Sequence, residues 1–211
     1  MPCGKEQYWH YLRTISERNR FITGRVMESE VDRNHLLSLF YGERKPASPF
    51  RIRVFRGTKL GDFVDCDWLE VWCISQRAVD CLRAHGITGW DTYPVEVLDR
   101  RGVAIPGYLG LAITGRIGYL VGSESRLEER EPPVPQGKPY RVYVGMQLDC
   151  SEWDGSDLCT TAPSTSYVWA NQRAVDAIWE CKLTNVEYER VDQMDWHEAL
   201  FSVRKNPSVK W

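Results

Sequence analysis

The pentapeptide QRAVD occurs twice in the chain, at residues 76–80 and again at residues 172–176. Each copy follows a residue that favours the start of a helix, Ser75 in the first case and Asn171 in the second. The side-chain oxygen of such a residue accepts a hydrogen bond from a free backbone N–H group in the first helical turn. The repeat therefore predicts two helices that begin in the same way.

The similarity continues beyond the pentapeptide without a gap, because CLRAHGITGWDTYPV aligns with AIWECKLTNVEYERV. Gly89 falls on Asn185 in this alignment, and glycine and asparagine are the residue types that best tolerate a positive φ angle. The alignment predicts the order strand, helix, turn and strand in residues 71–97 and again in 168–192. The residues expected to act as caps or turns are Ser75, Gly86, Gly89, Asn171, Asn185 and Gly155.

The matching positions are mainly caps, apolar helix positions and turns, which favours two related structural units over a shared catalytic motif. Convergence of two unrelated segments remains an alternative. Arg77 and Arg173 occupy equivalent places in the two helices. Each could bind an anion near a helix N-terminus, or each could be a solvated residue of the first turn.

The remaining sequence predicts how these units are arranged. Hydrophobic spacing predicts helices over residues 5–20 and 29–41. EPPVPQGKP at 131–139 holds four Pro in nine residues, which is typical of a linker. We expect an α+β protein in which two related strand–helix–strand units pack as one body, preceded by a helical N-terminal segment. The expected divisions are the helical segment 1–48, a first α+β unit 49–130, the linker 131–139 and a second α+β unit 140–211.

Composition narrows the possible functions. The chain has 211 residues and a net charge of −2, which argues against a general nucleic-acid binder. Nine Trp and ten Tyr are more than a core of this size requires. Some of them could form a binding surface, where large amphipathic rings are favoured, although each one could also be a core residue.

The cysteines predict a protein without a metal site or disulfides. Seven Cys are present, no C-x-x-C pair occurs, and we find no His at metal-ligand spacing from a Cys or another His. We therefore expect all seven cysteines to be thiols, as is usual in a reducing compartment. The N-terminus lacks the apolar region of a signal peptide, and no run of 18 apolar residues occurs. These features predict a cytoplasmic protein.

A search for catalytic motifs finds no complete set. The glycine-rich segment 107–122 lacks the Lys and the Ser or Thr of a phosphate-binding loop, and G-x-S-x-G and H-E-x-x-H are absent. The acidic segment DCSEWDGSD at 149–157 does not fit a calcium loop, because Trp153 occupies a ligand position. It could instead be a contact surface or simply a tight turn. We expect no catalytic residues and no cofactor.

The order of these motifs resembles the bacterial polymorphic-toxin immunity proteins of immunity family eleven. The resemblance covers roughly residues 60–200 and rests on the helix, glycine and strand of each repeat and on the turn Trp153–Asp157 before the second copy. Two features depart from the family pattern. Gln76 and Gln172 stand where an acidic residue is common, and Lys182 stands opposite Gly86 of the first copy.

The resemblance implies a protein that binds and neutralises a cognate toxin domain in the cytoplasm, without catalysis and without nucleic-acid or membrane partners. A homo-oligomer is possible. The expected partner contacts are Trp153, Asp154, Asp157 and Trp169. The turn Trp153–Asp157 could equally be architectural. The alternatives to toxin binding are an enzyme or small-ligand protein that uses the acidic turn 149–157, and a structural homo-oligomer that uses its Trp-rich surface on itself.

Overall fold

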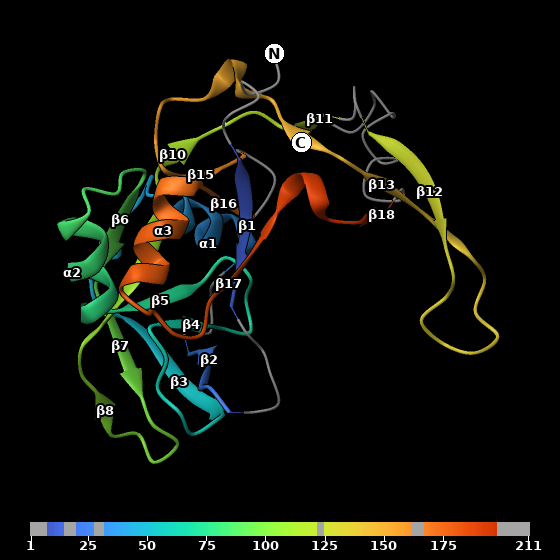
Figure 1. Cartoon of the computed structure of the whole chain (residues 1–211). Coiled ribbons are helices and arrows are strands. Elements are labelled where there is room, and N and C mark those ends of the chain that lie inside the picture. The colour runs from blue at the N-terminus through green and yellow to red at the C-terminus, as the bar shows by residue number, and fades with distance from the viewer. Residues whose placement is uncertain (1–7, 15–19, 28–31, 122–124, 162–166, 198–211) are drawn as a thin grey trace.

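A computed structural model describes residues 8–14, 20–27, 32–121, 125–161 and 167–197. The described part of the chain is mostly β, with 42% of its residues in strands and 18% in helices, and the strands form several sheets (Figure 1). The expected α+β class is therefore wrong. The two repeated helices are short, nine residues each, and they lie on sheets that recruit strands from other parts of the chain.

The first repeat belongs to a four-stranded antiparallel sheet. Its strand order is β4 (Phe63–Asp65), β5 (Trp72–Ser75), β9 (Tyr108–Ile113) and β6 (Trp90–Tyr93). Helix α2 (Gln76–Ala84) follows β5 directly. The sequence places strand, helix and strand in the expected order here, but the sheet also needs β4 and β9 to form.

The second repeat lies in a five-stranded sheet of nearly the same plan. Its strand order is β10 (Gly115–Arg116), β15 (Leu158–Thr160), β16 (Val168–Asn171), β1 (Trp9–Arg13) and β17 (Glu187–Arg190). Helix α3 (Gln172–Glu180) follows β16 as α2 follows β5. Strands β15, β16, β1 and β17 are thus the counterparts of β4, β5, β9 and β6.

The counterpart strands β9 and β1 come from different parts of the chain. In the first sheet β9 pairs with β5, with Ser75 opposite Tyr108. In the second sheet β1, near the N-terminus, pairs with β16, with Asn171 opposite Trp9. The second unit is therefore completed by residues far from it in sequence.

The expected helix over residues 5–20 is wrong, because its described part contains the strand β1. Trp9 and Leu12 are buried, and β1 lies between β16 and β17. A strand covered on both faces loses the alternation of polar and apolar residues, so its pattern is easily mistaken for a helix. The described part of the second expected helix, 29–41, contains the helix α1 (Arg33–Phe40). Asp32 caps α1 by accepting a hydrogen bond from the backbone N–H of His35, at 2.7 Å.

The other strands form further sheets. One has the order β2 (Thr23–Val26), β3 (Phe50–Arg56), β7 (Val95–Leu98) and β8 (Ala104–Ile105). A second pairs β11 (Leu120–Val121) with β14 (Gln147–Leu148). Short 3-10 helices lie at Cys150–Glu152 and Val191–Gln193.

A hairpin arm projects from the body of the molecule (Figure 1). It consists of β12 (Arg126–Arg130) and β13 (Tyr140–Val144), and β13 also pairs with β18 (Trp196–His197). The proline-rich segment 131–139, expected as a linker, is the loop of this hairpin. Because β1 and β10 both join the second sheet, strands from three of the four expected divisions contribute to it.

The main hydrophobic core lies between the two helices and the two large sheets. Both helices bury an apolar face, made of Ala78, Cys81 and Leu82 on α2 and of Ala174, Ala177 and Ile178 on α3. Cys181, which the hydrophobic spacing also places on the second face, is the C-cap of α3 and is half-buried. The two helices pack against each other, which brings the ends of the two repeats together. No helix in the described part of the chain is long and apolar enough to cross a membrane.

Candidate functional site: the helix pair and the acidic turn

The junction between the two repeats is built around two buried aspartates. Asp62 precedes β4 and is 5% exposed. Its carboxylate accepts hydrogen bonds from the hydroxyl of Ser75 at 2.7 Å, from the guanidinium of Arg77, and from Thr184 of the second repeat. Thr184 donates both its backbone N–H and its hydroxyl, each at 2.7 Å. Asp62 therefore connects the start of α2 to the turn after α3.

Asp157 makes the equivalent contacts, but it connects the start of α3 to the turn after α2. It is 4% exposed and accepts from the Asn171 amide at 2.9 Å and from Arg173 at 2.7 Å. Thr88 of the first repeat donates its backbone N–H and its hydroxyl, each at 2.9 Å. The two networks are related position by position, so each repeat holds the turn of the other.

The two arginines complete this exchange. Arg77 donates to the carbonyl oxygens of Cys181 and Lys182, at 2.9 and 3.1 Å. Arg173 donates to those of His85 and Gly86, at 2.7 and 2.9 Å. Each guanidinium thus satisfies carbonyl groups at the C-terminal end of the opposite helix, which lack partners within that helix. Neither arginine is a free anion site or a purely solvated residue.

Both aspartates remain ionised at neutral pH. Burial by itself would raise the pKa of Asp62, but the hydrogen bonds from Arg77, Ser75 and Thr184 outweigh it and leave that pKa below its usual value. The pKa of Asp157 is lowered in the same way, since hydrogen bonds from Asn171 and Thr88 and the charge of Arg173 outweigh its burial. The charges hold the two repeats together.

The expected caps and turns have the geometry that the sequence predicts. Ser75 and Asn171 accept hydrogen bonds from the N–H groups of Ala78 and Ala174, at 3.1 and 3.0 Å. The φ angles of Gly86, Gly89, Gly155 and Asn185 are positive, which favours glycine or asparagine at these positions. The φ angle of Lys182 is positive as well. A Cβ atom at Gly89 would lie 2.0 Å from the carbonyl oxygen of Leu158, so this position needs glycine for space as well.

Two of the four expected partner contacts lie inside the protein. Asp157 is committed to the network above, and Trp169 is 1% exposed, with its indole N–H donating to the hydroxyl of Thr161 at 3.0 Å. The prediction that these two side chains present a binding surface is therefore wrong. A sequence motif alone does not reveal which side chains face the core.

The other two expected contacts belong to a tight turn. Asp154 is exposed, but its carboxylate accepts from the backbone N–H groups of Arg116 and Ser156, each at 2.9 Å. Trp153 is half-buried, packs edge-on against Trp9 at 5.5 Å between ring centroids, and donates to the Ser156 carbonyl at 2.9 Å. These contacts favour the architectural interpretation of the turn.

The exposed face of α3 is a feature that the sequence interpretation missed. Trp179 is 70% exposed, and the acidic side chains of Asp176 and Glu180 are exposed on the same face of the helix. The equivalent residue of α2 is Arg83. The sequence contains a signal for it, because Trp179 lies outside the apolar stripe of α3. A large hydrophobic residue at such a position is not explained by packing in the core.

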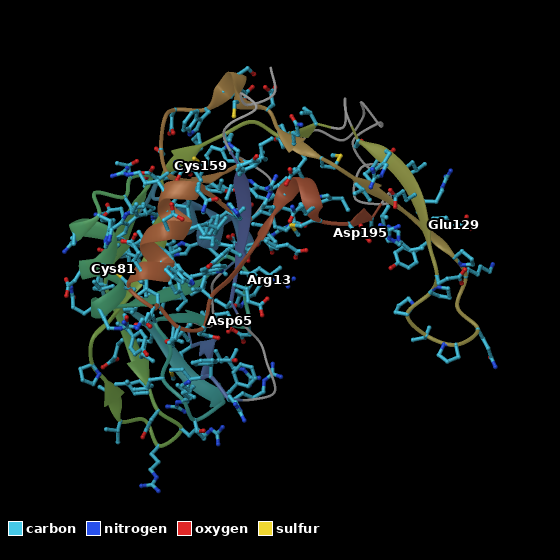
Figure 2. The ribbon with its side chains drawn as sticks, viewed as in Figure 1. Arg13, Asp65, Cys81, Glu129, Cys159 and Asp195 are labelled. Atoms are coloured by element: carbon cyan, nitrogen blue, oxygen red, sulfur yellow. A yellow bond between two sulfur atoms is a disulfide. The ribbon has the colours of Figure 1, made fainter. Side chains whose placement is uncertain are left out.

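The cysteines also differ from expectation. Cys81 of α2 and Cys181 at the end of α3 form a disulfide, and Cys150 is disulfide-bonded as well. Among the described residues Cys66, Cys73 and Cys159 are free and buried. Cys81 lies at the junction of α2 and α3 (Figure 2), and His85 lies beside this disulfide. The sequence does offer one signal that we overlooked, namely that His85 follows Cys81 by one helical turn.

No protein-family model matches the chain, and no curated protein matches it either.

Proposed function

We propose that the chain is an immunity protein that binds a cognate bacterial toxin domain and neutralises it in the cytoplasm, with the exposed face of α3 as its central contact. The observation that carries the proposal is the 70% exposure of Trp179. Tryptophan is the residue type most enriched among those that dominate binding energy at protein interfaces. The motif order described above supports the choice of a toxin as the partner.

The acidic neighbours of Trp179 define the chemistry of the partner surface. Asp176 and Glu180 are one helical turn apart, and both are exposed on the helix face that carries Trp179. A toxin domain that places Lys or Arg around an apolar pocket would match this face. Opposite charges of this kind accelerate association and set specificity more than they add affinity.

The rigidity of α3 strengthens the proposal. Its buried stripe, its Asn171 cap and the contact between Arg173 and Asp157 fix the helix on the sheet. A contact residue on such a helix loses little conformational freedom on binding, and this loss is a main cost of association. The face of α3 is therefore already ordered for a partner.

The proposal is tested by co-expression with the protein encoded by each adjacent gene in a bacterial host. We expect one neighbour to arrest growth when expressed alone, and this chain to restore growth and purify with it as a stable complex. A chain that neither protects the host nor forms a complex with either neighbour would contradict the immunity function.

Two variants test the contact surface. Trp179→Ala should weaken the complex by about 30-fold or more, the loss of about 2 kcal/mol that is typical of a dominant interface residue. Arg83→Ala is the matched control, because Arg83 occupies the equivalent position on α2. Equal effects of both variants on affinity would exclude α3 as the central contact. A homodimer of the chain alone that Trp179→Ala dissociates would instead assign this face to self-association.

A further inference from the structure

Three side chains with metal-binding atoms converge where α2 and α3 end. They are Cys81 and His85, one turn apart at the end of α2, and Cys181, which follows α3. The two sulfur atoms and Nδ1 of His85 all lie within 4.8 Å of one another. Nδ1 is 3.9 Å from each sulfur. The fold creates this cluster, since Cys181 is 96 residues from His85 in sequence.

The geometry of the cluster fits a tetrahedral centre. Zinc binds thiolate sulfur at about 2.3 Å and imidazole nitrogen at about 2.1 Å, which places the sulfur and nitrogen ligands of one ion about 3.6 Å apart. Nδ1 of His85 is close to that separation from both sulfurs. The two sulfurs are bonded to each other in the disulfide, so after reduction they would have to move apart to about 3.8 Å, the separation of two thiolates on one tetrahedral ion. The His85 side chain is 35% exposed. Solvent can therefore reach the cluster and supply a fourth ligand.

The other nitrogen of His85 has the partner that a metal-bound histidine requires. Nε2 lies 3.2 Å from a carboxylate oxygen of Glu180. Metal-binding histidines almost always donate their second N–H to a carboxylate, a carbonyl or water, which orients the ring and makes the ligand more basic. Nδ1 now lies 2.9 Å from the carbonyl oxygen of Cys81, and that oxygen keeps a hydrogen bond from the backbone N–H of His85, at 3.1 Å, when the ring binds a metal.

We propose that, when the disulfide is reduced, Cys81, His85 and Cys181 bind one thiophilic divalent cation, with zinc as the best fit. Reduction by a phosphine consumes one water and gives two thiols and the phosphine oxide. The thiols then lose two protons as two sulfur–metal bonds form, and His85 holds its remaining proton on Nε2, facing Glu180. The disulfide and the metal centre exclude each other, because both use the same two sulfurs.

The metal would replace the disulfide as the covalent connection between the helices. Disulfides are rare in the cytoplasm, where thiols are kept reduced. A bound cation would still fix the end of α2 to the residue after α3 and would add its binding free energy to the stability of the folded state. The test is independent of the toxin-binding proposal, because its readout is metal binding by the chain alone, even though Glu180 belongs to both sites.

The test is a cobalt and zinc titration of the full chain under anaerobic conditions, after reduction with a phosphine and removal of the reductant. We expect one equivalent of Co²⁺ to give the thiolate charge-transfer and visible bands of a tetrahedral site, and one equivalent of Zn²⁺ to remove them. The unreduced protein should give no such bands. Absence of a stoichiometric site in the reduced protein would overturn the proposal.

Variants separate this cluster from other thiols. Cys81→Ser and Cys181→Ser should each abolish the cobalt bands, and His85→Ala should change them and weaken binding. Glu180→Gln should lower zinc affinity about tenfold or more through the orientation of His85. Cys159→Ser is the control, because Cys159 is a free, buried thiol outside the cluster, and it should leave the spectrum unchanged. Bands that persist in both cluster cysteine variants would assign the metal elsewhere and refute the site.

Discussion

The turn after α2 and the turn after α3 are held by the same contacts, whereas the helices before them present different surfaces. Thr88 binds Asp157 and Thr184 binds Asp62, with an arginine and a helix cap completing each network. On the outer face of the helices, by contrast, Arg83 of α2 is replaced by Trp179 of α3. Positions that the two repeats share are therefore structural, and positions where they differ are the candidates for function.

The shared network gives the largest expected effect on stability. Asp62→Ala and Asp157→Ala should each lower the free energy of unfolding by about 3 kcal/mol or more, because each leaves an arginine and several buried donors without their acceptor. Chemical denaturation measures this loss. Asp154→Ala is the control, since its carboxylate is exposed and accepts from the backbone N–H groups of Arg116 and Ser156 without an arginine partner. A large loss in only one of the two buried aspartates would show that the repeats are not equivalent.

The same carboxylates predict a pH dependence. Their folded-state pKa values lie below the usual 3.8, so the folded state binds their protons less readily than the unfolded state does. Their stabilising contribution is therefore fully present above pH 4 and is lost as the pH falls below 3.8 through the folded-state values. Unfolding free energies measured from pH 6 to pH 3 should fall more steeply for the wild type than for Asp62→Asn. Parallel pH profiles of the two proteins would contradict this linkage.

Glycine positions provide the next test of the comparison. Gly89→Ala should cost about 2 kcal/mol or more, since its φ angle is +85° and a Cβ would lie 2.0 Å from a backbone carbonyl oxygen. Gly155→Ala has a similar φ angle, +89°, but no atom within 4 Å of the added Cβ, and should cost about 1 kcal/mol. Thermal unfolding compares the two variants. Equal costs would mean that backbone strain alone, without the close approach, determines the role of Gly89.

The helix caps should give smaller losses. Ser75→Ala and Asn171→Ala each remove an N-cap, at about 1 kcal/mol, and also one hydrogen bond to a buried aspartate. We expect Asn171→Ser to retain much of this stability, because serine performs both tasks in the first repeat. The three variants are compared by their denaturation midpoints. An Asn171→Ser variant as unstable as Asn171→Ala would limit the equivalence of the repeats to their backbones.

The sequence alone could predict those parts of the fold that depend on local chemistry. The caps at Ser75 and Asn171 and the turns at Gly89 and Asn185 were predicted because neighbouring backbone groups decide them. The strand β1 was not, because its pairing with β16 is set by residues far away and its two buried faces remove the alternating pattern. The contact between Asp62 and Thr184 spans 122 residues, so nothing in the local sequence indicates it. For the same reason Asp157 was assigned to a surface.

The smallest expected effect on stability concerns the position where the two helices differ most. Trp179→Ala and Arg83→Ala should each change the free energy of unfolding by less than about 0.5 kcal/mol, because both side chains are exposed and neither caps a helix or fills the core. Trp179→Ala should also shift the intrinsic fluorescence maximum to shorter wavelength, since it removes a solvated indole while four others, Trp9, Trp72, Trp169 and Trp196, are buried. A large loss of stability in Trp179→Ala would mean that this ring supports the fold, and its exposure would then no longer favour a binding role.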